Sequence, residues 1–497
     1  GYKVALCEQF NDLENDIKKN KGPMKRKVVR VITPGTILEE SFFDDNPNNF
    51  LCSWNEVNGS HSISWVDLST GIFCVQKIDM NQSNAIETAL ERLSPRELLM
   101  PLKMKEKKPN YFRGCVTFQA DSLFQSDVCE ERLKKFYKIK SLVAFGEFSR
   151  SCISTAGAIL GYVSLTQKGK LPLLKKIKQW KSIEVMEIDI FSRKSLELLK
   201  TQSGEKNGSL FNAINQTLTS GGTRLLLERL NGPSLDKLEI NKRLDTVSNF
   251  VSENLLRKKI RDVLKLIPDI ERSLSRIQFD RGGPRDLISI KTGCEKAYEI
   301  SKLISDHDFT FPKKELNEVS KNLTIDIGFI KELDLAITES PPLFARDGNF
   351  IKKGFSNELD EIKLIRDNSR EKILSLQLRY INQTGIQSLK IKFNNVLGYH
   401  LEVRKTHETK LLEQDEFIHR QGTAQASRFT TAELVSIESK LTDARSKSLN
   451  IELEIYESLV KNCLQRSKKL LSIFQGLSSL DVAIGFAELA HKWNYSR

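Results

Sequence analysis

The stretch LKIKFNNVLGYHLEVRK, residues 389–405, decides how the second half of this chain is organised. Apolar and polar residues alternate on both sides of Asn394-Asn395, which is the pattern of two short strands joined by a tight turn. The flanking segments have apolar residues at three- and four-residue spacing, and they predict long helices over 357–383 and 431–473. A small β-hairpin is therefore expected as an insertion at the tip of two antiparallel helices.

Each predicted strand has one polar and one apolar face. On the first strand, Leu389, Ile391 and Phe393 are expected to pack, while Lys390, Lys392 and Asn394 point the other way. On the returning strand the polar face carries His400, Glu402 and Arg404, and the apolar face carries Tyr399, Leu401 and Val403. We expect Arg404 to lie beside the two lysines if the hairpin pairs in the usual register.

The polar side chains around this hairpin are of the kinds that bind phosphate groups. A polar loop leads to HRQGTAQASRF, residues 419–429, and residues 370–430 carry ten Lys/Arg against six Asp/Glu. Such side chains hold a duplex through its backbone without reading its sequence. A hairpin that only caps the helix ends with a solvated face would look similar. The candidate DNA contacts are Lys390, Lys392, Asn394, Asn395, Arg404, Arg420, Gln421, Gln425 and Arg428.

Overall composition favours a polyanionic partner. The net charge is +13 and the pI is about 9.2, although surplus surface lysines alone would produce the same values. Eight scattered cysteines form no CxxC pair, which argues against a zinc site or a disulfide framework and for a reducing cytosol. We see no signal peptide and no apolar run of membrane-spanning length.

The organisation along the chain changes near residue 189. Residues 37–188 alternate strand-like and helix-like patterns, which predicts a sheet covered by helices, and the pattern from 189 onwards is helical. Thr430 as N-cap and Glu433 at N3 predict a capping box for the second long helix. The start at Gly1 and the end just after a helical pattern suggest a piece of a longer protein.

Several motifs together resemble the MutS family of DNA mismatch-repair proteins. These are GYKVALCEQ (1–9), KGPMKRKVVRVITPGT (21–36), GGPRDL (282–287), NELDEI (357–362), TGIQSLKIKFNNVLGYHLEV (384–403) and RFTTAEL (428–434). They occur in order over essentially the whole chain.

The resemblance implies a multidomain fold, α/β followed by mainly α. It implies the end of a mismatch-binding domain at 1–36, an RNase H-like α/β connector at 37–188, a helical core with long antiparallel levers at 189–371 and 431–497, and a small β clamp at 372–430. The implied partners are double-stranded DNA, a second copy of the full-length protein, and a MutL-type protein at the connector, with no membrane. The implied location is the bacterial cytoplasm and nucleoid.

The resemblance also implies two activities, ATP hydrolysis and mismatch recognition, whose motifs are not expected within residues 1–497. The chain has no G-x-x-x-x-G-K-[ST] phosphate loop, so we expect no catalytic, metal or cofactor residues, and an ATPase domain using ATP and Mg would follow residue 497. The family's mismatch-reading Phe-x-Glu is expected upstream, and the tripeptides at 145–147 and 486–488 are interpreted as accidental. The family's clamp loop reads close to RQTLxNAERF, so Gln425 and Ser427 depart from it.

Other interpretations remain open. The chain could be a MutS-like paralogue acting on recombination intermediates, or a helical scaffold that binds only proteins. Asp67, with Glu147 and Asp189, could hold metal ions as in an RNase H-type nuclease, but a strand-end aspartate capping the turn at Ser69-Thr70 is the simpler interpretation. An acid-free lysine run with Trp180 could follow a phosphate backbone or be a solvated face: Lys168, Lys170, Lys175, Lys176, Lys178 and Lys181.

Overall fold

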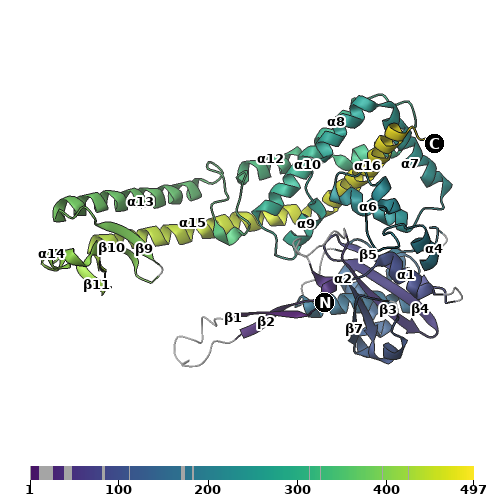
Figure 1. The fold of residues 1–497 in the computed structure, drawn as a ribbon, viewed down its shortest axis with the longest axis horizontal. Coiled ribbons are helices and arrows are strands. Elements are labelled where there is room, and N and C mark those ends of the chain that lie inside the picture. The colour runs from purple at the N-terminus through teal and green to yellow at the C-terminus, as the bar shows by residue number, and fades with distance from the viewer. Residues whose placement is uncertain are drawn as a thin grey trace. The chain divides into compact units, whose positions relative to one another are not determined.

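The computed structural model (Figure 1) divides into two compact units, which are described separately. The first comprises residues 1–282, 289–330 and 464–497, and the second comprises 283–288 and 331–463. The described residues are 2–9, 26–37, 48–80, 84–110, 112–168, 174–181, 184–312, 314–324, 326–394, 396–423 and 425–496. A mixed α/β region followed by a helical region is present, as predicted.

The first unit begins with two sheets. Strands β1 (Val4–Gln9) and β2 (Arg26–Ile32) form an antiparallel pair. A six-stranded sheet follows in the order β7-β6-β3-β4-β5-β8, in which β3, β4 and β5 are antiparallel neighbours and the other pairings are parallel. Its strands are β3 (Phe50–Val57), β4 (Ser60–Asp67), β5 (Ile72–Ile78), β6 (Glu97–Pro101), β7 (Cys115–Gln119) and β8 (Lys178–Gln179).

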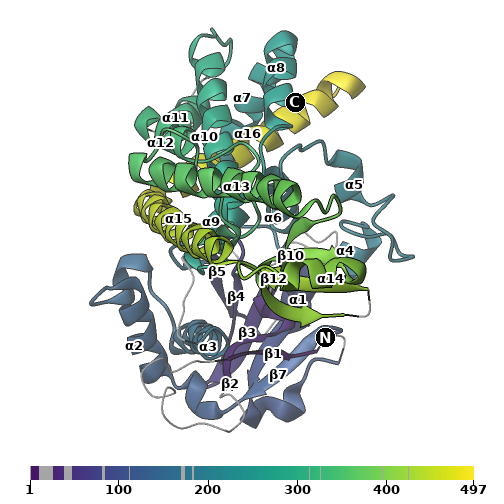
Figure 2. The same ribbon diagram turned by 90° about the vertical axis from the view of Figure 1, so that its left-hand side faces the viewer.

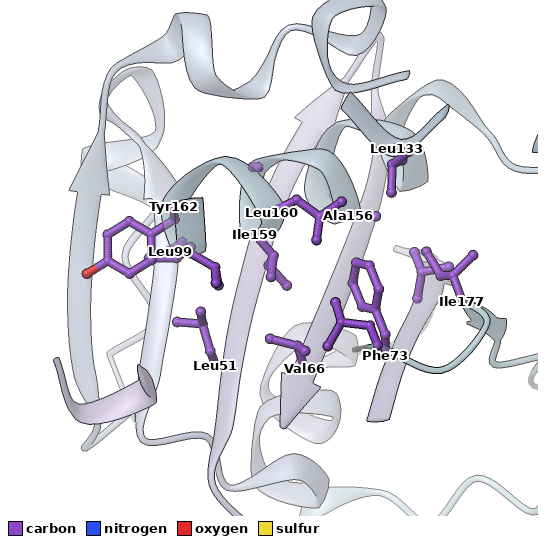
Figure 3. Packing of buried hydrophobic residues seen from close by; sticks show 14 of the residues in the cluster. Leu51, Val66, Phe73, Leu99, Leu133, Ala156, Ile159, Leu160, Tyr162 and Ile177 are labelled. Carbon is purple, nitrogen blue, oxygen red and sulfur yellow. The ribbon is translucent and has the colours of Figure 1, made fainter. Parts of the chain in front are cut away.

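Helices cover both faces of the six-stranded sheet. On one face, α3 (Arg150–Thr166) and α2 (Ser126–Tyr137) pack on side chains such as Leu51 and Val66 (Figure 3). On the other face, α1 (Ala85–Leu93) packs against a cluster that includes Trp65. Figure 2 shows α2 and α3 together on one side of the strands. This three-layer arrangement is the sheet covered by helices that the sequence predicts.

A buried carboxylate anchors the TPGT turn to the sheet. Glu97, at the start of β6, accepts hydrogen bonds from Thr33 Oγ1 (2.5 Å) and Gly35 N (3.0 Å). Its other oxygen accepts from Thr117 Oγ1 and Tyr162 Oη, each at 2.7 Å. A Cβ at Gly35 would lie 2.8 Å from Leu51 Cδ1, so the close approach of this turn requires glycine. The TPGT sequence at residues 33–36 is therefore explained by its packing against Glu97 and Leu51, which are distant in the chain.

The helical part of the first unit surrounds α16 (Ser467–Trp493), which packs against α6, α7, α8, α9 and α11. In the described part of the chain, α16 alone has the length and composition of a membrane span, with mean hydropathy 1.5 over a window that is 67% buried. The expectation that no apolar run reaches this length was wrong. Because most of this window is buried inside the first unit, α16 is a core helix of that unit. The other helices are α4 (Ile190–Ser195), α5 (Leu210–Ile214), α6 (Ser220–Asn231), α7 (Lys237–Ser252), α8 (Asn254–Leu264), α9 (Ile270–Gln278) and α11 (Lys314–Leu323).

A buried ion-pair network joins α6 and α9 to the strand region of the first unit. Arg224 on α6 donates to Asp269 (2.7 and 2.9 Å) and to Glu271 (2.8 Å). Lys175, before β8, donates to Glu271 at 3.0 Å. Burial raises the pKa of both carboxyls, but the neighbouring cations outweigh it and hold each pKa below its ordinary value.

The second unit is built on two long antiparallel helices. Helix α13 (Asn357–Thr384) leads to a small sheet, and α15 (Ala432–Gln465) returns from it (Figure 1). Tyr380 Oη donates to Thr431 Oγ1 near the sheet (2.9 Å), and Lys363 pairs with Glu452 farther along (2.7 Å). The order of these contacts shows that the helices are antiparallel. Helices α10 (Pro284–Ser305), α12 (Ile327–Ala336) and α15 have residues in both units.

Two predicted details of the long helices were wrong. The second helix is capped one residue later than predicted: Leu434 N donates to Thr431 Oγ1 (3.1 Å), so N3 is Leu434 and not Glu433. Thr430 instead ends a strand. The helix also stops at Gln465, because Arg466 leaves the helical conformation before α16 starts.

Candidate nucleic-acid interface

The segment between α13 and α15 is a four-stranded antiparallel sheet with the order β11-β12-β10-β9. The predicted hairpin is present as β9 (Lys390–Asn394) and β10 (Gly398–Arg404). The stretch 419–429, expected to follow a polar loop, is largely a second hairpin of β11 (Ile418–Gly422) and β12 (Ala426–Thr430). A short helix, α14 (Glu408–Leu412), connects the two hairpins.

One face of this sheet forms the core that holds it to the helices. Leu401, Val403 and Phe429 are buried, and they pack with Leu376 of α13 and Leu441 of α15. Because side chains alternate along a strand, the strand residues next to these buried ones point to the opposite face of the sheet. The sheet is therefore fixed by one apolar face, which leaves the polar face available for a ligand.

A row of polar residues crosses the polar face through all four strands. Lys390 on β9 lies opposite Glu402 on β10, Glu402 lies opposite Arg428 on β12, and Arg428 lies opposite Gln421 on β11. Lys392 Nζ is 2.6 Å from one Glu402 oxygen, and Arg428 Nε is 3.4 Å from the other. The hydrogen bond from Lys392, assisted by Arg428, lowers the pKa of Glu402. Two of the predicted DNA-binding cations thus share one carboxylate.

Three other predicted cations are exposed on this sheet, and none of them has an ion-pair partner among the described residues. They are Lys390, Arg404 and Arg420. Arg420 lies at a bulge in β11 between His419 and Gln421 and has no pairing partner on β12. Arg404 pairs with Ala426 of β12, so it lies diagonal to Lys390 and not directly beside the lysines as predicted.

The remaining candidate residues have more limited roles in this structure. Asn394 Oδ1 accepts hydrogen bonds from the backbone nitrogens of Val396 (3.0 Å) and Leu397 (2.6 Å), which shapes the hairpin turn. Gln425 is exposed beside the turn between β11 and β12. Asn395 lies outside the described residues.

Two residues of the first hairpin lie on the predicted faces, His400 opposite Lys392 and Phe393 opposite Tyr399, but their exposure differs from what those faces suggest. His400 was assigned to the polar face, but its side chain is 2% exposed, with Nδ1 at 3.0 Å from Gly398 O. Phe393 was expected to pack, but it is 50% exposed near the hairpin turn. Its ring contacts Tyr399 at 5.0 Å between centroids, and the Arg445 guanidinium lies 6.0 Å from the ring centroid. The strand extends beyond the apolar core at this end, so its last apolar residue remains half-covered.

The nuclease interpretation finds no support in the geometry. Asp67 Oδ1 accepts from Ser69 N (2.9 Å) and Ser69 Oγ (2.6 Å), which is the predicted turn cap. Asp189 caps α4 by accepting from the backbone of Phe191 and Ser192. Within the described ranges there is no cluster of three or more His, Cys, Asp or Glu side chains able to hold a metal ion.

The acid-free lysine run is largely solvated, since Lys168, Lys176, Lys178 and Lys181 are exposed and Lys175 is half-buried. Lys175, Lys178 and Lys181 each have a carboxylate oxygen within 4.0 Å. Lys176 is exposed. Lys170 lies outside the described residues.

Comparison with known proteins assigns the family. Residues 192–487 match the family model described as MutS domain III, residues 49–175 match MutS domain II, and residues 1–41 match MutS domain I. The chain belongs to the MutS family. The α/β region with its six-stranded sheet thus falls largely within MutS domain II, and the β9–β12 sheet lies within MutS domain III.

Curated relatives extend the MutS assignment over the whole chain. A DNA mismatch repair protein MutS from Ruegeria pomeroyi is 38% identical over 100% of this chain and 57% of its own length. Proteins of the same name from Rhizobium meliloti and Wolbachia pipientis wMel are each 37% identical over 100% of this chain, which covers 55% and 61% of their lengths. The chain therefore spans just over half the length of the relatives it matches.

Proposed function

We propose that this chain is the DNA-gripping part of a bacterial MutS-type DNA mismatch repair protein, and that residues 372–430 form a clamp on duplex DNA. The observation that carries this proposal is the polar face of the β9–β12 sheet. It presents exposed Lys390 and Arg404 on a platform that is held from behind by an apolar core, and exposed Arg420 lies at the bulge of the neighbouring strand β11. Membership of the MutS family supports duplex DNA as the polyanion.

The clamp holds DNA through phosphate groups. Lys390, Arg404 and Arg420 are the primary contacts, and Gln421 and Gln425 can add hydrogen bonds from their amide groups. Lys392 and Arg428 share Glu402, so they contribute only when a phosphate competes with that carboxylate. Asn394 ends β9 next to the hairpin turn, where it can approach the duplex edge, and Asn395, outside the described residues, stays a candidate from the sequence. We assign these contacts to phosphate groups, which carry no sequence information, so the clamp alone should hold matched and mismatched duplexes equally.

The other regions of the chain are assigned from the resemblance to the MutS family and from the strand order. Residues 1–36 belong to the mismatch-binding domain, and 37–188 form an RNase H-like connector. The β7-β6-β3-β4-β5 order supports this, because an antiparallel three-strand meander is extended by parallel strands beside its first member. Residues 189–371 and 431–497 form the core and levers, with α13 and α15 as the antiparallel lever pair.

Further partners follow from the family. We assign the full-length protein a homodimeric state, a cytoplasmic and nucleoid location, and contact with a MutL-type partner through the connector. ATP hydrolysis belongs to the full-length protein, since residues 1–497 contain no phosphate loop.

A duplex-binding titration at several salt concentrations tests the clamp. The chain should bind matched and mismatched duplexes with equal affinity, and affinity should fall steeply with salt. In the triple variant Lys390→Gln, Arg404→Gln, Arg420→Gln, the log–log salt slope should shrink by about 2.7, at roughly 0.9 for each phosphate contact. Replacing the exposed Lys237, Lys242 and Lys258 of α7 and α8 with Gln is the control for net charge. A protein-only scaffold would show no duplex binding at all.

A further inference from the structure

Most of the positive charge of this chain does not come from the proposed clamp. Residues 372–430 hold nine Lys/Arg and five Asp/Glu, a net of +4. Residues 132–181 hold twelve Lys/Arg and a single acid, Glu147, a net of +11 in a chain whose total is +13. A second positively charged surface is therefore expected in the α/β region of the first unit.

The fold brings the two ends of this basic segment together. Tyr137, the last residue of α2, donates from Oη to Lys175 O at 2.9 Å. The Tyr137 ring also contacts Phe145 edge-on, with centroids 4.9 Å apart, and Lys176 Nζ lies 5.6 Å from the centre of the Phe145 ring. The lysines just after α2, Lys138 and Lys140, and Lys176 before β8 are thus brought together by the contact between Tyr137 and Phe145.

Four lysines of this surface lack compensating acids. Lys135, Lys138, Lys140 and Lys176 are exposed, and no carboxylate within the described ranges pairs with them. Lys134 differs, because Glu130 (2.8 Å) and Glu131 (3.1 Å) neutralise it. A shallow hollow of about 510 Å³ opens here, and it is lined by the lysines of 134–140 together with Glu131 and Ile139.

We propose that these four lysines, named here the connector basic surface, form a second binding site for the phosphate backbone of duplex DNA, separate from the clamp. The proposal rests on the proposed function, since it assumes that the chain binds DNA. Lys135, Lys138 and Lys140 line the hollow, Lys176 lies over the Phe145 ring, and unpaired ammonium groups match the closely spaced charges of a nucleic-acid backbone. Among the described residues that line this hollow, the half-buried Ile139 is the single apolar side chain, so the hollow lacks the apolar, aromatic-rich centre in which the binding energy of protein interfaces concentrates.

The position of Lys138 allows binding and folding to be separated. Lys138 is the C-cap that follows α2, and its φ of 55° is a left-handed conformation that glycine adopts more easily than lysine. Lysines near a helix C-terminus also stabilise the helix through its dipole, which is the purely structural explanation for this cluster. Lys138→Gly removes the charge while easing the backbone, so it should weaken DNA binding without lowering the melting temperature.

The decisive experiment compares three variants of the full chain by duplex titration over a range of salt. The surface variant is Lys135→Gln, Lys138→Gly, Lys140→Gln, Lys176→Gln. The clamp variant is the triple variant above. The charge control replaces Lys237, Lys242, Lys258 and Lys259, all exposed on α7 and α8, with Gln. The surface variant should lose up to about 3.6 in log–log salt slope, at roughly 0.9 per lysine, and the charge control should lose far less.

A site-resolved measurement completes the test. Acetylation of lysine amines, read by mass spectrometry, should be slowed at Lys135, Lys138, Lys140 and Lys176 when duplex is added, and this protection should persist in the clamp variant. If the clamp variant loses affinity while the surface variant behaves like the charge control, the second site is overturned and the clamp stands. If the chain binds no duplex at all, the proposed function is wrong, and the second site is wrong with it. Protection by poly-glutamate but not by duplex would assign the surface to an acidic protein and overturn the DNA site.

Discussion

The carboxylate of Glu402 lies 2.6 Å from Lys392 Nζ, so an acid on the proposed DNA face neutralises one of the cations expected to bind DNA. The other Glu402 oxygen is 3.4 Å from Arg428 Nε. Glu402 is also opposite Lys390 in the strand register. If this face binds DNA as proposed, a phosphate must compete with Glu402 for Lys392 and Arg428, so we expect Glu402 to lower the affinity for duplex DNA.

Glu402→Gln should strengthen duplex binding. The substitution keeps the shape of the side chain but releases Lys392 and Arg428, so the log–log salt slope should steepen by up to about 1.8, at roughly 0.9 for each cation. Fluorescence anisotropy with a labelled duplex measures both affinity and slope. Asp415→Asn removes the same charge from an exposed acid of the proposed clamp and should have a smaller effect. Equal gains in the two variants would show that only net charge matters.

Leu376→Ala should destabilise the second unit, because Leu376 is 3% exposed in the core beneath the sheet. The loss should be about 2–5 kcal/mol of unfolding free energy, as for other large-to-small core substitutions. Leu374→Ala is the matched control on the same helix, where the side chain is 64% exposed. Urea unfolding followed by circular dichroism should separate the two variants, and similar losses would mean that the face of α13 is misassigned.

Arg224→Met should destabilise the first unit at neutral pH by about 3–5 kcal/mol, since it leaves Asp269 and Glu271 charged, buried and short of a partner. Thermal melting measures the effect. Glu239→Gln, which removes an exposed ion pair with Arg243 on α7, should change stability little.

The same network predicts a pH dependence. Asp269 and Glu271 have pKa values held below their ordinary values in the folded protein. Their ion pairs therefore stabilise the fold above the unfolded-state pKa, and this contribution is lost as pH falls through the folded-state pKa. The difference in melting temperature between wild type and Arg224→Met should be largest near neutral pH and should shrink in acid. A difference that is constant with pH would contradict the assigned network.

Glu97→Gln should loosen the TPGT turn. Four donors converge on the two carboxylate oxygens, and an amide would replace one acceptor with a donor that faces other donors. The expected loss is about 1–3 kcal/mol, together with faster hydrogen exchange at Gly35 N. Glu106→Gln, at an exposed acid after β6, is the control. Unchanged exchange at Gly35 in Glu97→Gln would show that the turn is held by packing alone.

The sequence pattern was sufficient to predict those elements whose structure depends on residues close together in the chain. The hairpin at 389–405 was predictable because alternation identifies strands and the Asn394-Asn395 pair marks the turn. The start of α13 followed from periodicity in the same way. The strand-end role of Asp67 was also accessible, since its partner Ser69 is two residues away.

The second hairpin was harder to predict. Residues 418–430 are polar and basic, and they lack the apolar alternation that identifies a strand. Phe429 is their only fully buried large apolar side chain, and the pairing of β12 with β10 places it in the core. Strand formation here depends on that neighbouring strand more than on local propensity.

The amino-acid sequence by itself determined the order of the main elements, the first inserted hairpin, the family and the number of cations near it. Only the tertiary structure decided which cations are free, because the register across β9, β10 and β12 places Glu402 between Lys390 and Arg428. It also decided that His400 is buried and that Glu97 holds a turn more than sixty residues away in the chain. Local patterns follow from the periodicity of the backbone, whereas the charge and exposure of a side chain depend on partners that only folding brings within hydrogen-bonding distance.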